Sequence, residues 1–159
     1  LQAPVAADLR QIVAIIKIAG ELERSADLVV NICKAARRIY GHDIDPMLRG
    51  VISKMSEQAQ KLFAATMEAF EESDSAKAAA IDDMDSYLDS LHRQFIQQIF
   101  ESHSKSKIDL QVAVQLAVVA RFYERIGDHA KNIAEFIIYI VKSADVRHTS
   151  LAEVESVVR

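Results

Sequence analysis

A ten-residue stretch occurs twice in this chain, and the repeat constrains the fold more than any other feature. The first copy begins at Glu23 and the second at Glu124, and Glu, Arg, Asp, Asn and Ile recur at the same relative positions. A spacing of about one hundred residues is too long for a solenoid unit and suits the duplication of a small helical bundle. The repeat therefore predicts two equivalent helices, one toward each end of the chain.

The composition favours an all-α fold, an elongated antiparallel helical bundle. Gly and Pro are scarce, Trp is absent, and Ala, Ile, Leu, Glu and Lys are abundant. Asp45 and Pro46 form a typical helix start, with Asp as the N-cap and Pro at the first helical position. Hydrophobic spacing and such start and stop signals predict helices over residues 5–40, 45–73, 76–101 and 108–142, followed by a polar tail with a short terminal helix through residue 158.

The first predicted helix matches the last one, so we divide the chain into two unequal parts. Residues 1–43 read as the last helix of a first, truncated bundle, and residues 44–159 as a complete three-helix bundle with a C-terminal tail. We expect the apolar stripe of the first helix to be covered by upstream residues, by a second chain or by the bundle itself. The stripe consists of Ile12, Ile15, Ile16, Ala19, Leu22, Ala26, Val29, Val30 and Cys33.

Several classes of protein are disfavoured by the bulk properties. The formal net charge of −4 argues against nucleic acid as a partner, and no run of about eighteen apolar residues predicts a membrane span. No signal peptide is recognisable. The single cysteine, Cys33, excludes an intramolecular disulfide, fits a reducing cytoplasm and is expected to be a small core residue.

Carboxylates one helical turn apart are the strongest candidates for a functional site. A multivalent cation would offset both the mutual repulsion of such a pair and the cost of burying it. Oxygen ligands of this kind suit magnesium, manganese, calcium or iron. Glu23 is expected to point toward the packed side of its helix. The three pairs are Glu23 and Asp27, Glu124 and Asp128, and Asp85 and Asp89.

Simpler roles for these carboxylates are also compatible with the sequence. Arg24 and Arg125 precede an aspartate by three residues and are placed to form ordinary ion pairs, and acidic pairs are common on solvated helix faces. A carboxylate-bridged di-iron enzyme would need two Glu-x-x-His units, and only the spacing of Asp89 and His92 approaches one. No nucleophile with a base and no phosphate-binding glycine loop is visible, so no catalytic residue is assigned.

Taken together, these motifs resemble the PhoU family of phosphate-signalling regulators. The resemblance rests on both copies of the Glu-Arg-x-x-Asp-x-x-x-Asn-Ile motif, on the acidic stretch 82–89 and on the closing motif 145–148. It implies two three-helix bundles in tandem, of which this chain lacks the first two helices. It also implies multinuclear metal sites, with iron, zinc, manganese or magnesium as candidates. By position, Asp85, Asp89, Glu124 and Asp128 would serve one site, and Glu23 and Asp27 the other.

The resemblance implies a regulator that is not an enzyme. A member of this family is expected to be a cytoplasmic homodimer, or to lie at the inner face of the membrane without spanning it. It would restrain phosphate-starvation signalling by linking the ATPase of the phosphate ABC transporter to a membrane sensor histidine kinase. The alternatives are a regulatory domain of another membrane transporter and, less favoured, a carboxylate-bridged di-metal enzyme.

Overall fold

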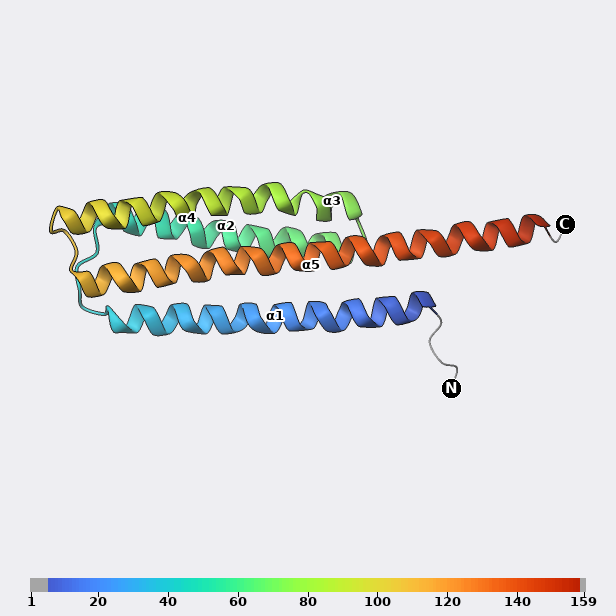
Figure 1. Ribbon diagram of the computed structural model, residues 1–159, viewed down its shortest axis with the longest axis horizontal. Coiled ribbons are helices and arrows are strands. Elements are labelled where there is room, and N and C mark those ends of the chain that lie inside the picture. The colour runs from blue at the N-terminus through green and yellow to red at the C-terminus, as the bar shows by residue number, and fades with distance from the viewer. Residues whose placement is uncertain (1–5, 158–159) are drawn as a thin grey trace.

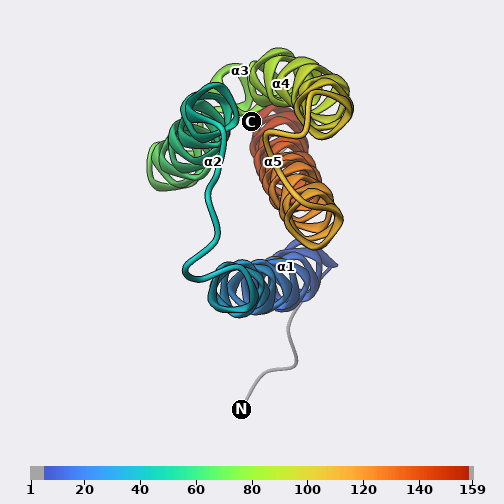
Figure 2. The same cartoon turned by 90° about the vertical axis from the view of Figure 1, so that its left-hand side faces the viewer.

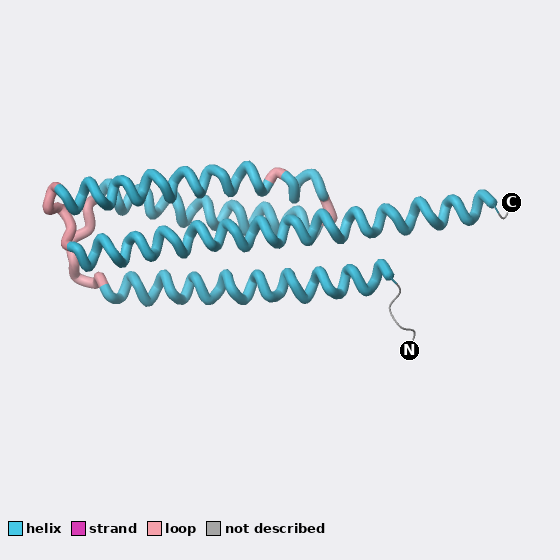
Figure 3. Tube along the Cα trace, in the orientation of Figure 1, coloured by secondary structure: helices cyan, strands magenta, loops and turns pink. Residues whose placement is uncertain are grey.

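The computed structural model describes the backbone of residues 6–157 and the side chains of residues 8–143. In this part of the chain all regular structure is helical, which confirms the all-α prediction (Figure 3). None of the described helices has a segment long and apolar enough to cross a membrane. The helices are α1 (Ala6–Arg38), α2 (Pro46–Glu71), α3 (Ser75–Ala79), α4 (Ile81–Ser104) and α5 (Leu110–Val157).

Three long helices form a bundle, and the fourth lies beside it. Helices α2, α4 and α5 pack together, with the short α3 between α2 and α4 (Figure 1). Helix α1 runs antiparallel to α5 along its outer side, and Figure 2 shows it separated from α2 and α4. Within the described residues the backbone of α1 approaches closely only that of α5. Helix α5 therefore belongs to the bundle and also carries α1.

Local sequence signals explain where two of these helices begin. The Asp45 Oδ1 atom accepts a hydrogen bond of 3.1 Å from the Met47 backbone N–H, and Pro46 is the first helical residue, as predicted. Asp74 caps α3 in the same way, by accepting from the backbone N–H groups of Ala76 and Lys77 at 2.8 and 3.0 Å. The Asp45 cap lies in the connection from α1 to α2, and the Asp74 cap lies in the connection that reverses the chain between α2 and α4.

The hydrophobic core lies between α2, α4 and α5. Its largest members are almost inaccessible to solvent, and each such side chain contributes about 1.5–3 kcal/mol by leaving water. They recur along each of the three helices at the spacing that places side chains on one helix face, as the sequence predicts. They are Leu48, Met55 and Leu62 of α2, Ile81, Leu88 and Phe95 of α4, and Val112, Ile133 and Ile137 of α5.

The apolar stripe predicted for α1 is not covered by the bundle, so its cover by upstream residues or by a second chain stays a prediction. Its stripe of larger apolar side chains is largely exposed, and Ile16 reaches 64% exposure. The buried face is instead narrow and rich in small residues, including Ala14, Ser25 and Ala35 with Ile18. Small side chains let the α1 backbone approach α5 closely, which explains why this face packs on α5 in place of the face with the larger apolar side chains.

Two predicted helix boundaries are also wrong. The helix expected over 76–101 is divided at Ala80 into α3 and α4. Helix α5 continues to Val157, whereas a tail was expected from residue 143. No Gly or Pro follows Lys142, and polar composition alone does not end a helix. The motif 145–148 thus lies on helical backbone, and its side chains are outside the described residues.

Candidate functional site

A buried carboxylate lies where α4 packs against α5. Asp85 is only 6% exposed, and its Oδ1 atom has no hydrogen-bond partner among the residues that the structure describes. It faces Gly127 of α5: a Cβ added there would overlap Asp85 Oδ1 and lie 2.8 Å from Leu88 Cδ2. The glycine between Glu124 and Asp128 therefore leaves the space that this carboxylate occupies.

Neighbouring charges act on the same carboxylate. Burial, the largest cause, and the negative charges of Asp89 and Asp128 together raise the pKa of Asp85 to about 6. Lys131 opposes the shift, and its ammonium group is paired with Asp82 across the two helices. The structure thus brings three of the predicted ligands, Asp85, Asp89 and Asp128, into one electrostatic environment.

The fourth predicted ligand of this site makes a different contact. Glu124 is half-buried, and its carboxylate forms an ion pair with Arg121 one turn earlier on α5. Among residues 8–143 no three His, Cys, Asp or Glu side chains converge closely enough to hold a metal ion as they are placed. The donor chemistry suits a hard cation, but closing a coordination shell would require rotation of these side chains. The metal assignment stays a prediction.

The first predicted pair, Glu23 and Asp27, lies on an exposed part of α1. The expectation that Glu23 points toward the packed side is wrong, because Glu21 occupies that side instead. Arg24, expected to be a partner for Asp27, pairs with Glu21. The side chains of Glu23 and Asp27 are therefore open to solvent and are not joined to the acidic cluster of α4 and α5.

A polar cluster that sequence reasoning missed joins α1 to α5. Glu21 and His129 are 7% and 5% exposed, and Glu21 Oε2 lies 2.5 Å from His129 Nδ1. Asn132 donates to the same oxygen at 3.3 Å, and Arg24 donates to the other one. Burial would raise the pKa of Glu21, but the hydrogen bonds from His129, Asn132 and Arg24 outweigh it and hold that pKa below its ordinary value.

The repeat itself carried a signal for this cluster. With the two copies aligned, Glu21 corresponds to Phe122 and His129 corresponds to Leu28. Each charged or titratable residue thus replaces an apolar one at the equivalent position, and the two replacements meet across the interface. Asn132, the asparagine of the second motif copy, donates a hydrogen bond across the same interface.

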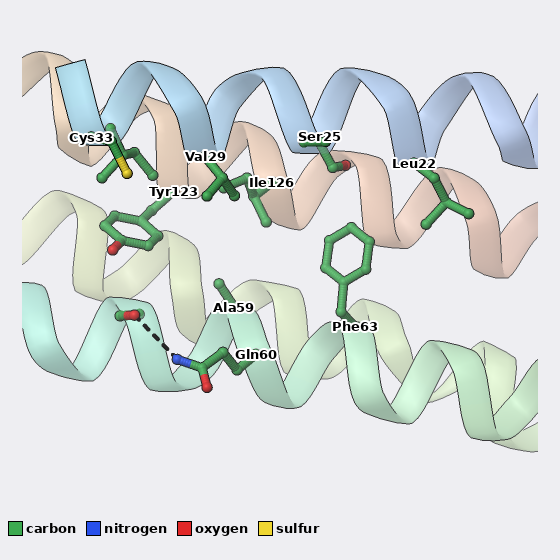
Figure 4. A pocket seen from close by; sticks show the side chains of 12 residues that line it. Leu22, Ser25, Val29, Cys33, Ala59, Gln60, Phe63, Tyr123 and Ile126 are labelled. Carbon is green, nitrogen blue, oxygen red and sulfur yellow. Dashed lines mark hydrogen bonds between the residues drawn. The ribbon is translucent and has the colours of Figure 1, made fainter. Parts of the chain in front are cut away.

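An apolar groove of about 490 Å³ lies between α1 and α2, and α5 forms its floor (Figure 4). Side chains of α1 and α2 point into it, among them Cys33, which is exposed and not the core residue that was predicted. Ser25 and Ile126, equivalent in the repeat, are both buried and both line it, so the two motif copies lie opposite each other. Its larger apolar lining residues are Leu22, Val29, Ile32, Phe63, Tyr123 and Ile126.

Comparison with known proteins agrees with this architecture. The sequence profile described as the PhoU domain matches residues 1–36 and 52–137, which is most of the chain. The chain belongs to the PhoU family. The two matched segments follow the division between α1 and the bundle of α2 to α5.

Comparison with two curated PhoU proteins shows how much of the length of such a protein this chain covers. The phosphate-specific transport system accessory protein PhoU of Serratia marcescens is 34% identical over 91% of this chain and 59% of its own length. PhoU homolog 2 of Mycobacterium bovis is 34% identical over 87% of the chain and 65% of its own length. The chain therefore spans less than two thirds of these relatives.

Solved PhoU structures share the fold. The crystal structure of PhoU from Pseudomonas aeruginosa superimposes with a TM-score of 0.79 and 26% identity, over 89% of this chain and 68% of the other. The phosphate transport system regulatory protein PhoU from Streptococcus pneumoniae gives a TM-score of 0.78 at 23% identity, over 86% and 64%. The second likeness bears on the fold alone.

Proposed function

We propose that this chain acts in the regulation of phosphate uptake, as an adaptor that restrains phosphate-starvation signalling. In this role it would connect the ATPase of the phosphate ABC transporter to the membrane sensor histidine kinase, from the cytoplasm and as a homodimer. Membership of the PhoU family is the observation that carries the proposal, together with relatives named as accessory proteins of phosphate transport. The chain would act by binding, since no nucleophile with a base was recognised in its sequence.

We also propose that the acidic cluster on α4 and α5 binds a metal ion. Asp85, Asp89 and Asp128 would supply oxygen ligands, with Glu124 released from Arg121, and Glu23 and Asp27 would form a second, exposed site. The support is the buried Asp85 Oδ1 atom, which has no hydrogen-bond partner in the described part of the chain and lies near Gly127 and two further carboxylates. A bound iron, zinc, manganese or magnesium ion would supply the positive charge that this group lacks.

Three features of the chain itself bear on this proposed site: the space at Gly127, the burial of Asp85 and the charge of Lys131. Gly127 gives the Asp85 carboxylate access to α5, and burial by Leu88 and its neighbours disfavours the charged form. Lys131 supplies a positive charge that acts on Asp85, but its ammonium group is already paired with Asp82. A cation bound between α4 and α5 would therefore favour the ionised carboxylates and hold the two helices together.

Elemental analysis tests the metal proposal. The purified protein should contain metal above the level of its buffer, and Asp85→Ala/Asp128→Ala should lose it. Glu57→Ala/Glu71→Ala, on the exposed side of α2, is the matched control and should keep the wild-type content. Glu23→Ala/Asp27→Ala measures the second site separately. Equal metal content in the wild type and in Asp85→Ala/Asp128→Ala would falsify metal binding at α4 and α5.

Pulldown with the transporter ATPase and with the cytoplasmic part of the sensor kinase tests the adaptor role. Association with both, stronger in phosphate excess than in starvation, is expected. Light scattering of the same preparation measures the proposed homodimer. Absence of association with either protein, from a sample that is folded by circular dichroism, contradicts the adaptor role and leaves the metal proposal untouched.

A further inference from the structure

One end of the molecule is formed by the two longer connections between helices. This loop end comprises residues 34–49 and 100–111 and faces the viewer in Figure 2. Its two connections are joined by polar contacts: His42 Nδ1 lies 2.8 Å from Asp109 Oδ2, and Ser102 Oγ donates to Asp45 Oδ2 at 2.6 Å. Lys107 Nζ lies 3.3 Å from the same Asp45 oxygen. The contacts make one preorganised surface from segments distant in sequence.

The loop end is positively charged on an acidic protein. It holds six lysines and arginines against four carboxylates, whereas the rest of the chain has thirteen against nineteen. Three of the four carboxylates are already paired: Asp45 with Lys107, Asp109 with His42 and Glu101 with Lys105. This internal pairing leaves a surplus of cations facing solvent.

The surplus cations are gathered on α1 and α2. Lys34, Arg37 and Arg49 form no ion pair with any residue that the structure describes. Lys34 and Arg37, with Arg38, line a hollow of about 340 Å³ at the end of α1. A hollow lined by three cations, with no carboxylate among its lining residues, suits a phosphate group.

Large apolar side chains project from the same end. Tyr40 is 91% exposed, Phe100 71%, Leu110 64% and Met47 58%. They come from the turn after α1, from α4, and from the first residues of α5 and α2, so they belong to four separate segments of the loop end. A tyrosine and a phenylalanine beside lysines and arginines are the residues that favour the interface of a membrane.

We propose that the loop end docks on an anionic lipid surface, with its cations on lipid phosphates and its apolar tips among the headgroups. A protein partner would need a separate pocket for each dispersed tip, whereas a fluid lipid surface accommodates all of them. An acidic surface also complements the surplus of cations. The proposal goes beyond the role in phosphate uptake and does not depend on metal.

Vesicle co-sedimentation tests the proposal. The protein should bind vesicles of phosphatidylcholine mixed with phosphatidylglycerol and not vesicles of phosphatidylcholine alone, and added salt should weaken binding. Each cation near an anionic surface changes binding about fivefold, so Arg37→Gln/Arg49→Gln should weaken it by more than about tenfold. Tyr40→Ser/Phe100→Ser should weaken it as well. Inorganic phosphate, at matched ionic strength, should not displace the protein, which separates lipid from free phosphate as the ligand.

Two controls locate the contact on the molecule. Tyr139→Ser/Lys142→Gln removes an exposed tyrosine and a cation at the far side of α5 and should bind as the wild type does. Ile16→Ser tests the exposed apolar face of α1 and should also leave binding unchanged. The proposal is overturned if neutral and anionic vesicles bind equally, if neither binds, or if either control loses as much binding as Arg37→Gln/Arg49→Gln. Circular dichroism of every variant confirms that it is folded.

Discussion

Glu21 Oε2 and His129 Nδ1 lie 2.5 Å apart across the interface of α1 and α5, and both side chains are buried. Asn132 donates to the same oxygen. The other hydrogen bonds described between α1 and α5 are exposed and involve Arg38, whereas this cluster is buried. A buried charged group that loses its partner is costly, so the cluster has measurable consequences for stability.

Replacing Glu21 by alanine should lower the free energy of unfolding by about 3 kcal/mol, because it leaves His129 buried without its acceptor. Urea denaturation followed by circular dichroism measures the change. Glu23→Ala, two residues away and exposed, is the control and should stay within about 0.5 kcal/mol of the wild type. The double variant Glu21→Phe/His129→Leu, which copies the equivalent residues of the repeat, should recover part of the loss; no recovery would contradict a coupled pair.

The same carboxylate makes stability depend on acid. The pKa of Glu21 is held below its ordinary value of 4.5, so its contribution is present above that pH and is lost as the pH falls through the lowered pKa. The wild type should therefore lose stability in acid more steeply than Glu21→Gln. Parallel slopes for the two proteins, in urea titrations at a series of pH values, would show that folding does not lower the pKa of Glu21 and would contradict this prediction.

Replacing Asp85 by asparagine should stabilise the metal-free protein at neutral pH. Because the folded pKa is about 6 against an ordinary 3.8, the stability linked to this group is complete below 3.8 and lost as the pH rises through about 6. Above that pH the ionised, buried carboxylate of the wild type lowers the free energy of unfolding by up to about 3 kcal/mol. The uncharged amide of Asp85→Asn does not have this cost. Unfolding in a chelating buffer measures it, and the gap between the two proteins should close near pH 4.

An alanine at Gly127 should destabilise the bundle. Its methyl group would overlap Asp85 Oδ1 and crowd Leu88, and overpacking of this kind costs about 1–3 kcal/mol. Gly50→Ala is the matched control: nothing lies near the position of its Cβ, and alanine should stabilise α2 by about 0.5–1 kcal/mol. Thermal unfolding measures both changes in stability, which are expected to have opposite signs. Stabilisation by both substitutions would show that Asp85 moves aside at no cost.

Substitution of two neighbouring isoleucines tests which face of α1 packs on α5. Ile18 is buried against α5 and Ile16 is 64% exposed. Ile18→Ser should lower the stability by about 2–4 kcal/mol through lost burial and a buried hydroxyl, whereas Ile16→Ser should be nearly neutral. Urea denaturation of the pair measures the difference. The reverse order would support the packing face predicted from sequence.

Much of the fold follows from sequence because its signals are local. The start of α2 depends on Asp45 and Pro46, and the core positions of α2 and α4 follow a simple helical period. The end of α5 could not be found in this way, because the sequence after Lys142 contains polar residues but no Gly or Pro. The division at Ala80 has no such signal either.

The candidate site could be predicted only in part. Spacing placed Asp85 and Asp89 on one face of a helix, and the family resemblance grouped them with Asp128 of another helix; the structure brings the three into one electrostatic environment. The role of Glu21 could not be found from periodicity, which treats a carboxylate as an exposed residue. Its burial depends on His129, 108 positions away in the chain, and only tertiary structure brings the two together.

Glu21 and His129 also determine which helix can pack against α1. Two copies of α1, packed as α1 packs on α5, would set Glu21 against Leu28, the counterpart of His129, and leave a carboxylate short of a donor. Two copies of α5 would likewise set His129 against Phe122. The unlike residues therefore favour the pairing of α1 with α5 over the pairing of either helix with a copy of itself, because self-pairing would bury a polar group without its partner.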